Sequence, residues 1–243
     1  MSEPAPGATR WIPLESNPDV LNSWCSKAGL ITSEFEYSDI YGLDEDLLAL
    51  VPQPVKAVIL LLPLTDAIER KTQEEIAKIR REGQHHVDSS IIWIKQTIGN
   101  ACGTMALLHA IINTNVPVIP DSPIAKFIIE CRTLTPEARS HLLETTTLFS
   151  EIHSEVASAG QTAAPDANAK VDLHFTCFVK APDPANPSVR RLIELDGRRD
   201  GPLDRGLCTD LLKDVARVVK EHYVDTAASV QFSMLALAPP PEF

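Results

Sequence analysis

Four side chains of this 243-residue chain have the types and the order that thiol-dependent hydrolysis requires: Gln96, Cys102, His174 and Asp196. Such a reaction needs a nucleophilic sulfur, an imidazole that removes its proton, a group that orients the imidazole, and N–H donors for the oxyanion. Cys102 is the candidate nucleophile and His174 the candidate base. We expect Asp196 to orient His174, and the Gln96 amide and the Cys102 backbone N–H to donate to the oxyanion.

The neighbours of Cys102 favour its thiolate form. Residues 102–113 are apolar nearly all round, a pattern typical of a helix in the middle of a domain. Cys102 opens this helix, where the helix dipole and unpaired N–H groups lower the pKa of a thiol from its free value of about 8.5. Gly103 is interpreted as leaving room for the backbone of a substrate.

Two predicted strands bring the other two groups together. Residues 171–179, VDLHFTCFV, alternate between apolar and other residues, which predicts a strand with His174 on the face opposite its apolar positions. The segment RLIEL at 191–195 predicts a second strand, and Asp196 follows its last residue. Neighbouring strands of one sheet would place His174 and Asp196 in contact.

Each of these residues also has a simpler structural explanation. A cysteine in an apolar setting is more often buried and inert than catalytic. His174 alone could be a satisfied polar residue on a half-exposed strand. Asp196 precedes Gly197, and an Asp-Gly pair commonly forms a turn. The order of the residues, rather than any one of them, favours the hydrolase hypothesis.

The remaining histidines and cysteines are predicted to be structural. We expect His109 to be a hydrogen-bonded packing residue on the central helix. His85 and His86 follow a glycine that ends a helix and are predicted to be solvated, with metal binding left open as an alternative. Surface positions are predicted for His141, His153 and His222. Structural roles are predicted for Cys25, Cys131, Cys177 and Cys208.

The elements that position these groups alternate between helices and strands. Helices are predicted from Asn17–Pro18 to Ala28 with Gly29 as the stop, and at 44–50, 66–82, 122–132 and 135–147, with a further one capped by Thr209. Strands are predicted at 57–62, 171–179, 191–195 and 233–238. This mixture predicts an α/β fold in which helices flank a central sheet.

The chain shows no internal repeat and no composition break, so one domain is expected over 10–238, with tails at 1–9 and 239–243. Residues 150–170 are rich in Ala, Gly and Pro, and we predict a loop there. Loops this long inside compact domains are uncommon and are usually functional or disordered. This one leads directly to the strand that carries His174.

The acidic composition excludes some partners. The net charge of −11 and pI of about 5.1 argue against nucleic acid and anionic membranes. The first residues lack the pattern of a signal peptide, and the longest apolar run, at 57–62, is far shorter than the ~20 residues of a membrane span. Five cysteines without CxxC or metal-ligand spacing indicate free thiols. We expect a cytoplasmic, or also nuclear, enzyme without metal or cofactor.

Several segments resemble one known family. KQTIGNACGTMALLHAI, which contains Gln96 and Cys102, looks like the active-site segment of the ubiquitin C-terminal hydrolases. KVDLHF resembles the histidine strand of that family and ELDGRR its aspartate. RWIPLESNP, DIYGLDEDLLALVPQPVKAVILLLPLT and GQTAAP are also similar to family segments. The likeness covers roughly residues 10–238 in the right order and is closest to the small single-domain members.

The resemblance implies a papain-like cysteine protease fold with a knotted backbone, and a monomer that acts on ubiquitin. It implies that Gln96 contributes to the oxyanion hole, and that Glu15 and Asp39 face ubiquitin. Residues 150–170 correspond to the crossover loop of the family, a gate that restricts the leaving group to small adducts or short, unfolded peptides. The expected activity is a deubiquitinating thiol hydrolase that proceeds through an acyl-enzyme on Cys102.

Two other functions stay open at this point. Some relatives also process a ubiquitin-like modifier, so the chain could prefer such a protein. A catalytically idle ubiquitin-binding module is the other alternative, although such a module would lack a catalytic residue or have a closed site, and all four residues are present here.

Overall fold

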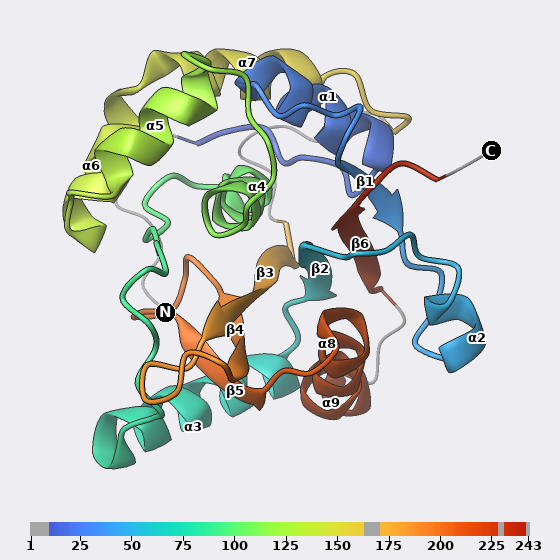
Figure 1. Cartoon of the computed structure of the whole chain (residues 1–243), viewed down its shortest axis with the longest axis vertical. Coiled ribbons are helices and arrows are strands. Elements are labelled where there is room, and N and C mark those ends of the chain that lie inside the picture. Colours follow the sequence, from blue (N-terminus) through green and yellow to red (C-terminus); the bar gives the residue numbers. More distant parts are fainter. Residues whose placement is uncertain (1–9, 163–170, 228–230, 242–243) are drawn as a thin grey trace.

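The computed structural model describes residues 10–162, 171–227 and 231–241, and its described elements form one sheet with helices on both faces (Figure 1). The strands are β1 Glu36–Asp39, β2 Ala57–Pro63, β3 Leu173–Pro182, β4 Arg190–Leu195, β5 Leu203–Leu207 and β6 Ser233–Ala238. They lie in the order β1-β6-β2-β3-β4-β5, and every pair is antiparallel. The predicted α/β class with an antiparallel-rich sheet is therefore confirmed.

The helices form two layers. Their bounds are α1 Pro18–Ala28, α2 Glu45–Leu48, α3 Asp66–Glu82, α4 Cys102–Ile112, α5 Pro123–Cys131, α6 Pro136–Thr145, α7 Thr147–Ala157, α8 Leu211–Val219 and α9 Asp225–Ala227, with a π-helical turn, η1 Lys220–Val224, between the last two. In Figure 1, α1 and α4–α7 cover one face of the sheet, and α3, α8 and α9 lie toward the other.

Alternation along the strands divides the core between these layers. On β2, Ile59 packs with residues of α1, α4, α5 and α7, whereas Val58 and Leu60 pack with α8. On β3, Cys177 joins the first group and Phe178 the second. Because side chains alternate across a sheet, the four inner strands β6, β2, β3 and β4 each contribute to both cores.

Local sequence signals explain the helix ends that were predicted. Asn17 caps α1 by accepting a hydrogen bond from the backbone N–H of Asp19, and Pro18 takes the first helical position. Gly29 has φ of +112° and donates its N–H to carbonyls of the last turn. This left-handed conformation suits glycine, and a side chain there would also collide with Ser122. The predicted helix and its bounds are confirmed.

Three differences from the predicted elements have physical reasons. Residues 147–157 form α7, so the loop expected from position 150 begins only after Ala157; α7 is stabilised by an apolar stripe that includes Phe149, Ile152 and Val156. The N-cap of α8 is Asp210, not Thr209, because the Asp210 carboxylate accepts from Lys213 N–H. Strands β1 and β5 were not predicted, since they are short edge strands that depend on their partners.

In the part of the chain that the structure describes, no helix combines the length and apolar character that crossing a membrane requires. The tail predicted at 1–9 and part of the predicted loop, 163–170, lie outside the described residues. The backbone knot stays a prediction.

Candidate active site

Cys102 is the first residue of α4, at a helix end without a side-chain cap. The N-cap, Ala101, has no side-chain oxygen, so the N–H groups of the first turn remain available to an anion. Asn100 turns the chain into the helix with φ of +60°, a left-handed conformation that asparagine tolerates. The cysteine is half-buried, whereas the ten residues that follow it in α4 are buried. The fold therefore exposes the sulfur at the end of an otherwise enclosed helix.

His174 and Asp196 meet at the start of β3. The register sets Leu195 opposite Cys177, so Asp196 leaves β4 beside the part of β3 that carries His174. His174 Nε2 donates a hydrogen bond to Asp196 Oδ1 over 2.7 Å, and both side chains are nearly buried. Because Nε2 faces the carboxylate, Nδ1 is the ring nitrogen left for the hydrogen bond between His174 and the Cys102 sulfur.

The electrostatics of this trio favour an ion pair. Burial alone would raise the pKa of the Cys102 thiol, but the hydrogen bond and positive charge of His174 outweigh it and lower the pKa below its usual value. Burial disfavours charged His174, yet Asp196 and Cys102 together raise its pKa to about 9. Burial also opposes the charge of Asp196, but His174 holds its pKa far below the usual range. Together these shifts favour the charged pair, a thiolate and an imidazolium, over the neutral pair.

Gln96 is anchored to the Asp196 turn and to the approach of α4. Its backbone N–H donates to the Gly197 carbonyl over 2.9 Å, and Trp93 Nε1 donates to the Asp196 carbonyl over 3.0 Å. The Gln96 side-chain amide donates to the Ile98 carbonyl, in the turn just before the helix. A Cβ at Gly197 would lie 2.8 Å from the Gln96 Cβ, so glycine is needed for this approach.

Replacing Gln96 by alanine is expected to lower kcat by a factor on the order of 10²–10³, the usual cost of one oxyanion-hole donor. KM should change little, because an oxyanion donor acts on charge that develops in the transition state. The steady-state rate of hydrolysis of a fluorogenic amide substrate measures this. Gln84→Ala is the matched control, since Gln84 instead bonds the backbone of Pro202 and Asp204, away from Cys102's cleft. Equal rates for Gln96→Ala and the parent would refute the assignment.

A cleft of about 460 Å³ opens in front of Cys102. Its walls come from the segment before α1, from β2, β3 and β6, and from the chain after α7; they include Leu14, Glu15, Leu61, Cys102, Thr162, Phe175 and Phe232. The lining is mainly apolar with the sulfur at one side. Such a cleft suits an extended, unfolded peptide segment better than a folded surface.

The structure separates the two carboxylates that were predicted to bind substrate. Glu15 lines the cleft of Cys102, whereas Asp39 lines a second hollow, of about 260 Å³, beside β6. Phe232 and Ser233 line both, so the two hollows adjoin. An extended partner could therefore contact both carboxylates along the start of β6.

Glu15 is already engaged with the chain that follows α7. Its Oε2 accepts the backbone N–H of Thr162 over 3.1 Å and the Thr162 hydroxyl over 2.9 Å. These hydrogen bonds lower the pKa of the Glu15 carboxyl. Within the predicted crossover loop, Ala157 and Thr162 thus line the cleft.

Two interpretations from the sequence were wrong. Gly103 does not leave room for substrate: a Cβ there would come within 3.1 Å of Leu14, so the glycine admits the segment before α1. His153 is not a surface residue but 1% exposed, with Nδ1 bonded to the Thr104 hydroxyl and Nε2 to the Ile12 carbonyl. The apolar stripe of α7, which includes Phe149, Ile152 and Val156, places His153 inward.

Other predictions about single residues are confirmed. His109 is buried, and its Nε2 accepts the N–H of Ile94 over 3.0 Å, so it is a packing residue. The pKa of His109 falls to about 4, chiefly through burial. Asp196 also forms the predicted turn, because Oδ1 accepts the N–H of Arg198 while it accepts from His174. Among the described residues, no cluster of His, Cys, Asp and Glu has the arrangement of a metal site.

The chain is similar over most of its length to one family of enzymes. A family model described as ubiquitin carboxyl-terminal hydrolase, family 1, matches residues 11–224. Ubiquitin carboxyl-terminal hydrolase 3 of Arabidopsis thaliana is 37% identical over 234 residues, which are 94% of this chain and 94% of that protein. Human ubiquitin carboxyl-terminal hydrolase isozyme L1 is 35% identical over 229 residues, with coverages of 93% and 96%.

A solved structure shares the fold. The catalytic domain of UCH37 from Trichinella spiralis, bound to ubiquitin vinyl methyl ester, matches with a TM-score of 0.69 and 21% identity over 95% of this chain and 96% of that one. This likeness confirms the predicted papain-like α/β fold.

Proposed function

The chain belongs to the ubiquitin carboxyl-terminal hydrolase family, and on that premise we propose that it is a deubiquitinating thiol hydrolase. Its substrates are small adducts or short peptides attached to the C-terminal glycine of ubiquitin. The observation that carries the proposal is the arrangement of the trio: a sulfur at an uncapped helix end, hydrogen-bonded to His174, which Asp196 orients through a 2.7 Å bond.

The reaction proceeds in two acyl-transfer steps. The Cys102 thiolate attacks the carbonyl carbon of the terminal glycine. The oxyanion that forms accepts hydrogen bonds from N–H groups of the first turn of α4 and of Gln96. When the C–N bond breaks, imidazolium His174 gives its proton to the leaving amine. Neutral His174 then takes a proton from water, whose oxygen attacks the thioester carbon. Release of the carboxylate restores the thiolate and the imidazolium.

The cleft supports recognition of an extended, basic tail. Its apolar walls would bury the aliphatic parts of the tail, and Glu15 and Asp39 would pair with arginines of ubiquitin. Each exposed ion pair contributes about 0.2–1 kcal/mol, so the carboxylates set orientation and encounter rate more than affinity. Glu15 can keep its hydrogen bonds with Thr162 in this pairing, because both end on Oε2 and an arginine can approach Oε1, which also accepts from Asn17 Nδ2 over 3.3 Å.

The size of the leaving group is predicted to limit turnover. Thr162, in the chain after α7, lines one part of the cleft, and Leu173, the first residue of β3, lines another. The segment between these two residues connects α7 to β3. We propose that a leaving group has to pass this connection, as the resemblance to the family implies. We expect a ubiquitin fusion to a short unstructured peptide to be cleaved at least 10-fold faster than a fusion of the same linker to a folded domain, an estimate from the rate lost when reacting groups are misplaced.

Two fusions that differ only in whether the C-terminal partner is folded test this limit, with cleavage followed by gel. A destabilised, unfolded variant of the same partner is the matched control and should regain the fast rate. Equal rates for the folded and unfolded partners would show that the connection does not restrict the leaving group.

The activity itself is tested with an electrophilic probe, ubiquitin vinyl methyl ester. The proposal requires covalent labelling of Cys102 and kcat/KM values on a ubiquitin amide that exceed those on a ubiquitin-like modifier amide. Tight binding without labelling would favour an idle binding module. Higher kcat/KM for the ubiquitin-like protein would assign the chain to that substrate instead.

A further inference from the structure

A buried arginine lies against the second oxygen of the catalytic carboxylate. The Arg199 side chain is 6% exposed, and its Nε lies 3.7 Å from Asp196 Oδ2. Among the described residues this N–H has no hydrogen-bond partner. Asp196 Oδ1 is occupied by His174 and by the Arg198 N–H, so Oδ2 is the oxygen that faces the guanidinium. A shortening of about 0.8 Å would give a charge-assisted hydrogen bond of about 2.9 Å.

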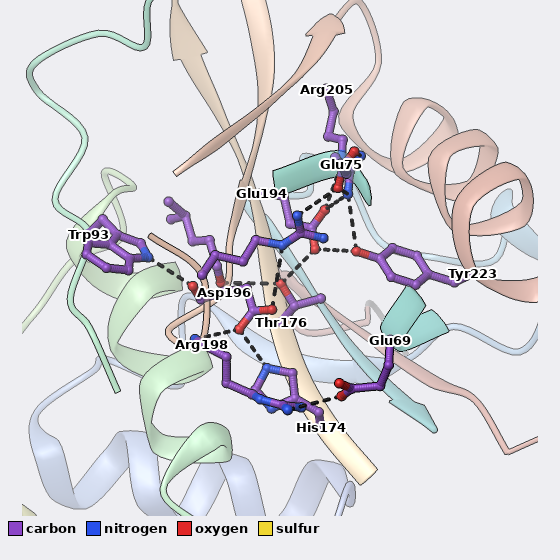
Figure 2. A network of polar contacts seen from close by, with 12 residues as sticks. Glu69, Glu75, Trp93, His174, Thr176, Glu194, Asp196, Arg198, Arg205 and Tyr223 are labelled. Carbon is purple, nitrogen blue, oxygen red and sulfur yellow. Dashed lines mark hydrogen bonds and ion pairs between the residues drawn. The ribbon is translucent and has the colours of Figure 1, made fainter. Parts of the chain in front are cut away.

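Arg199 is itself held from the opposite side by α3. Its Nη1 donates to Glu75 Oε2 over 2.7 Å, and Arg205 binds the other oxygen of the same carboxylate over 2.5 Å. In Figure 2, Glu75 extends from α3 toward Arg205. Glu75 therefore holds the guanidinium groups of Arg199 and Arg205 close to α3.

The same network of ion pairs and hydrogen bonds extends into the middle of the sheet. Glu194, which is 0% exposed, accepts from Arg205 Nε over 2.7 Å and from the Tyr223 hydroxyl over 2.5 Å. It also accepts from Thr176, two residues after His174 on β3 (Figure 2). The network thus links α3, β5 and η1 to both strands that carry the catalytic histidine and aspartate.

The charges of the network match an ionised His174. Three carboxylates (Glu75, Glu194 and Asp196) contact two guanidinium groups (Arg199 and Arg205), which leaves one negative charge uncompensated. His174 as imidazolium supplies the missing positive charge at Asp196. His109 on α4 also faces Asp196, but its pKa of about 4 keeps it neutral at the pH of the reaction.

We propose that Arg199 is a positioning residue for the hydrolytic trio, holding Oδ2 of Asp196 so that Oδ1 stays on His174, with Glu75 as the anchor that fixes Arg199 to α3. The idea deepens the proposed function but does not depend on ubiquitin as the substrate. If Asp196 turns away, His174 loses its counter-charge and Cys102 loses its imidazolium partner.

The test is the pH profile of Arg199→Met. The profile of kcat/KM against pH is bell-shaped: its acid limb reports formation of the Cys102 thiolate, and its alkaline limb reports loss of the His174 proton near pH 9. If Arg199 is a positioning residue, the acid limb moves to higher pH and the alkaline limb to lower pH. The bell-shaped profile therefore narrows. At its optimum kcat/KM should fall about tenfold, less than the ~10²-fold cost of a full 1 Å misplacement, because the Arg198 N–H still holds Asp196.

Two other outcomes would overturn the proposal. If Arg199 acted only through its charge, its removal would raise the pKa of both Cys102 and His174, and the whole bell would move to higher pH. If Arg199 served stability alone, the folded fraction would fall and both limbs would stay in place. Alkylation of Cys102 by iodoacetamide against pH gives the acid limb without any ubiquitin substrate, so this test survives a wrong substrate assignment.

Matched variants keep the test decisive even if Arg199→Met folds poorly. Glu75→Gln leaves both guanidinium charges but loosens their anchor, and it should narrow the bell in the same way. Arg199→Lys restores a cation and should recover part of the width of the pH profile of kcat/KM. Arg191→Met removes a partly buried arginine of the same sheet, paired with Asp204 over 2.7 Å, and should lower the unfolding temperature without moving either limb of the pH profile.

Discussion

Replacing Cys102 by alanine is expected to lower hydrolysis of a C-terminal ubiquitin amide by about 10⁶-fold, the usual cost of losing a covalent nucleophile. The loss follows because no other thiol can substitute: every other cysteine is buried in the core. Ubiquitin should still bind, since the apolar walls of the cleft and the carboxylates of Glu15 and Asp39 are unchanged. Steady-state hydrolysis and a separate binding titration measure the two quantities.

Cys25→Ala is the matched control for the loss of a thiol. Cys25 is buried on α1, away from the cleft, and burial raises its pKa so far that it stays a neutral thiol. This variant should lose some stability and keep its rate per folded molecule. Substantial turnover by Cys102→Ala would end the assignment of Cys102 as the nucleophile, whatever the control shows.

Replacing His174 by glutamine is expected to lower kcat/KM by about 10⁴–10⁶-fold, because base and nucleophile act as one unit. Without the imidazolium, the burial that now opposes ionisation of Cys102 is no longer outweighed, and the pKa of the thiol rises. The sulfur should then be protonated at pH 7. The rate of iodoacetamide alkylation at pH 7 should fall with the rate of hydrolysis, and both are measured on the same preparation.

The chain offers a second histidine–carboxylate pair as a control. His85 Nε2 lies 3.0 Å from Asp183 Oδ2, and neither residue lines the cleft of Cys102. His85→Gln removes this pair and should change neither alkylation nor hydrolysis. If His174→Gln left the alkylation rate at pH 7 unchanged, the thiolate would owe its stability to the helix end alone, and His174 would have to act later in the reaction.

Much of the local structure follows from the sequence because its causes are local. Asn17, Pro18 and Gly29 determine the ends of α1 within a few residues of themselves, and the alternation at 171–179 determines which face of β3 carries His174. The placement of Cys102 at the head of a buried helix follows in the same way. These signals are short in range, so a single sequence contains them in full.

The candidate trio was predictable as a set, but its geometry was not. Residue order and the likeness to family segments indicated Cys102, His174 and Asp196 together. The register that places Leu195 opposite Cys177, and so brings Asp196 to His174, depends on pairing between strands with separate positions in the chain. No local pattern near either residue determines that register.

What the tertiary structure alone decided lies in contacts between distant segments. Glu15 meets Thr162 across 147 positions, and Arg205 meets Glu75 across 130. In the sequence, Glu75 is one of many charged residues in the helix predicted at 66–82, and Arg199 follows a turn without any distinguishing neighbour. A charged side chain becomes buried only where the fold supplies an opposite charge to offset its lost hydration. The sequence by itself therefore determined the reacting groups and the elements that carry them, and the ion pairs of Glu75 on α3 with Arg199 and Arg205 decided which charges surround them.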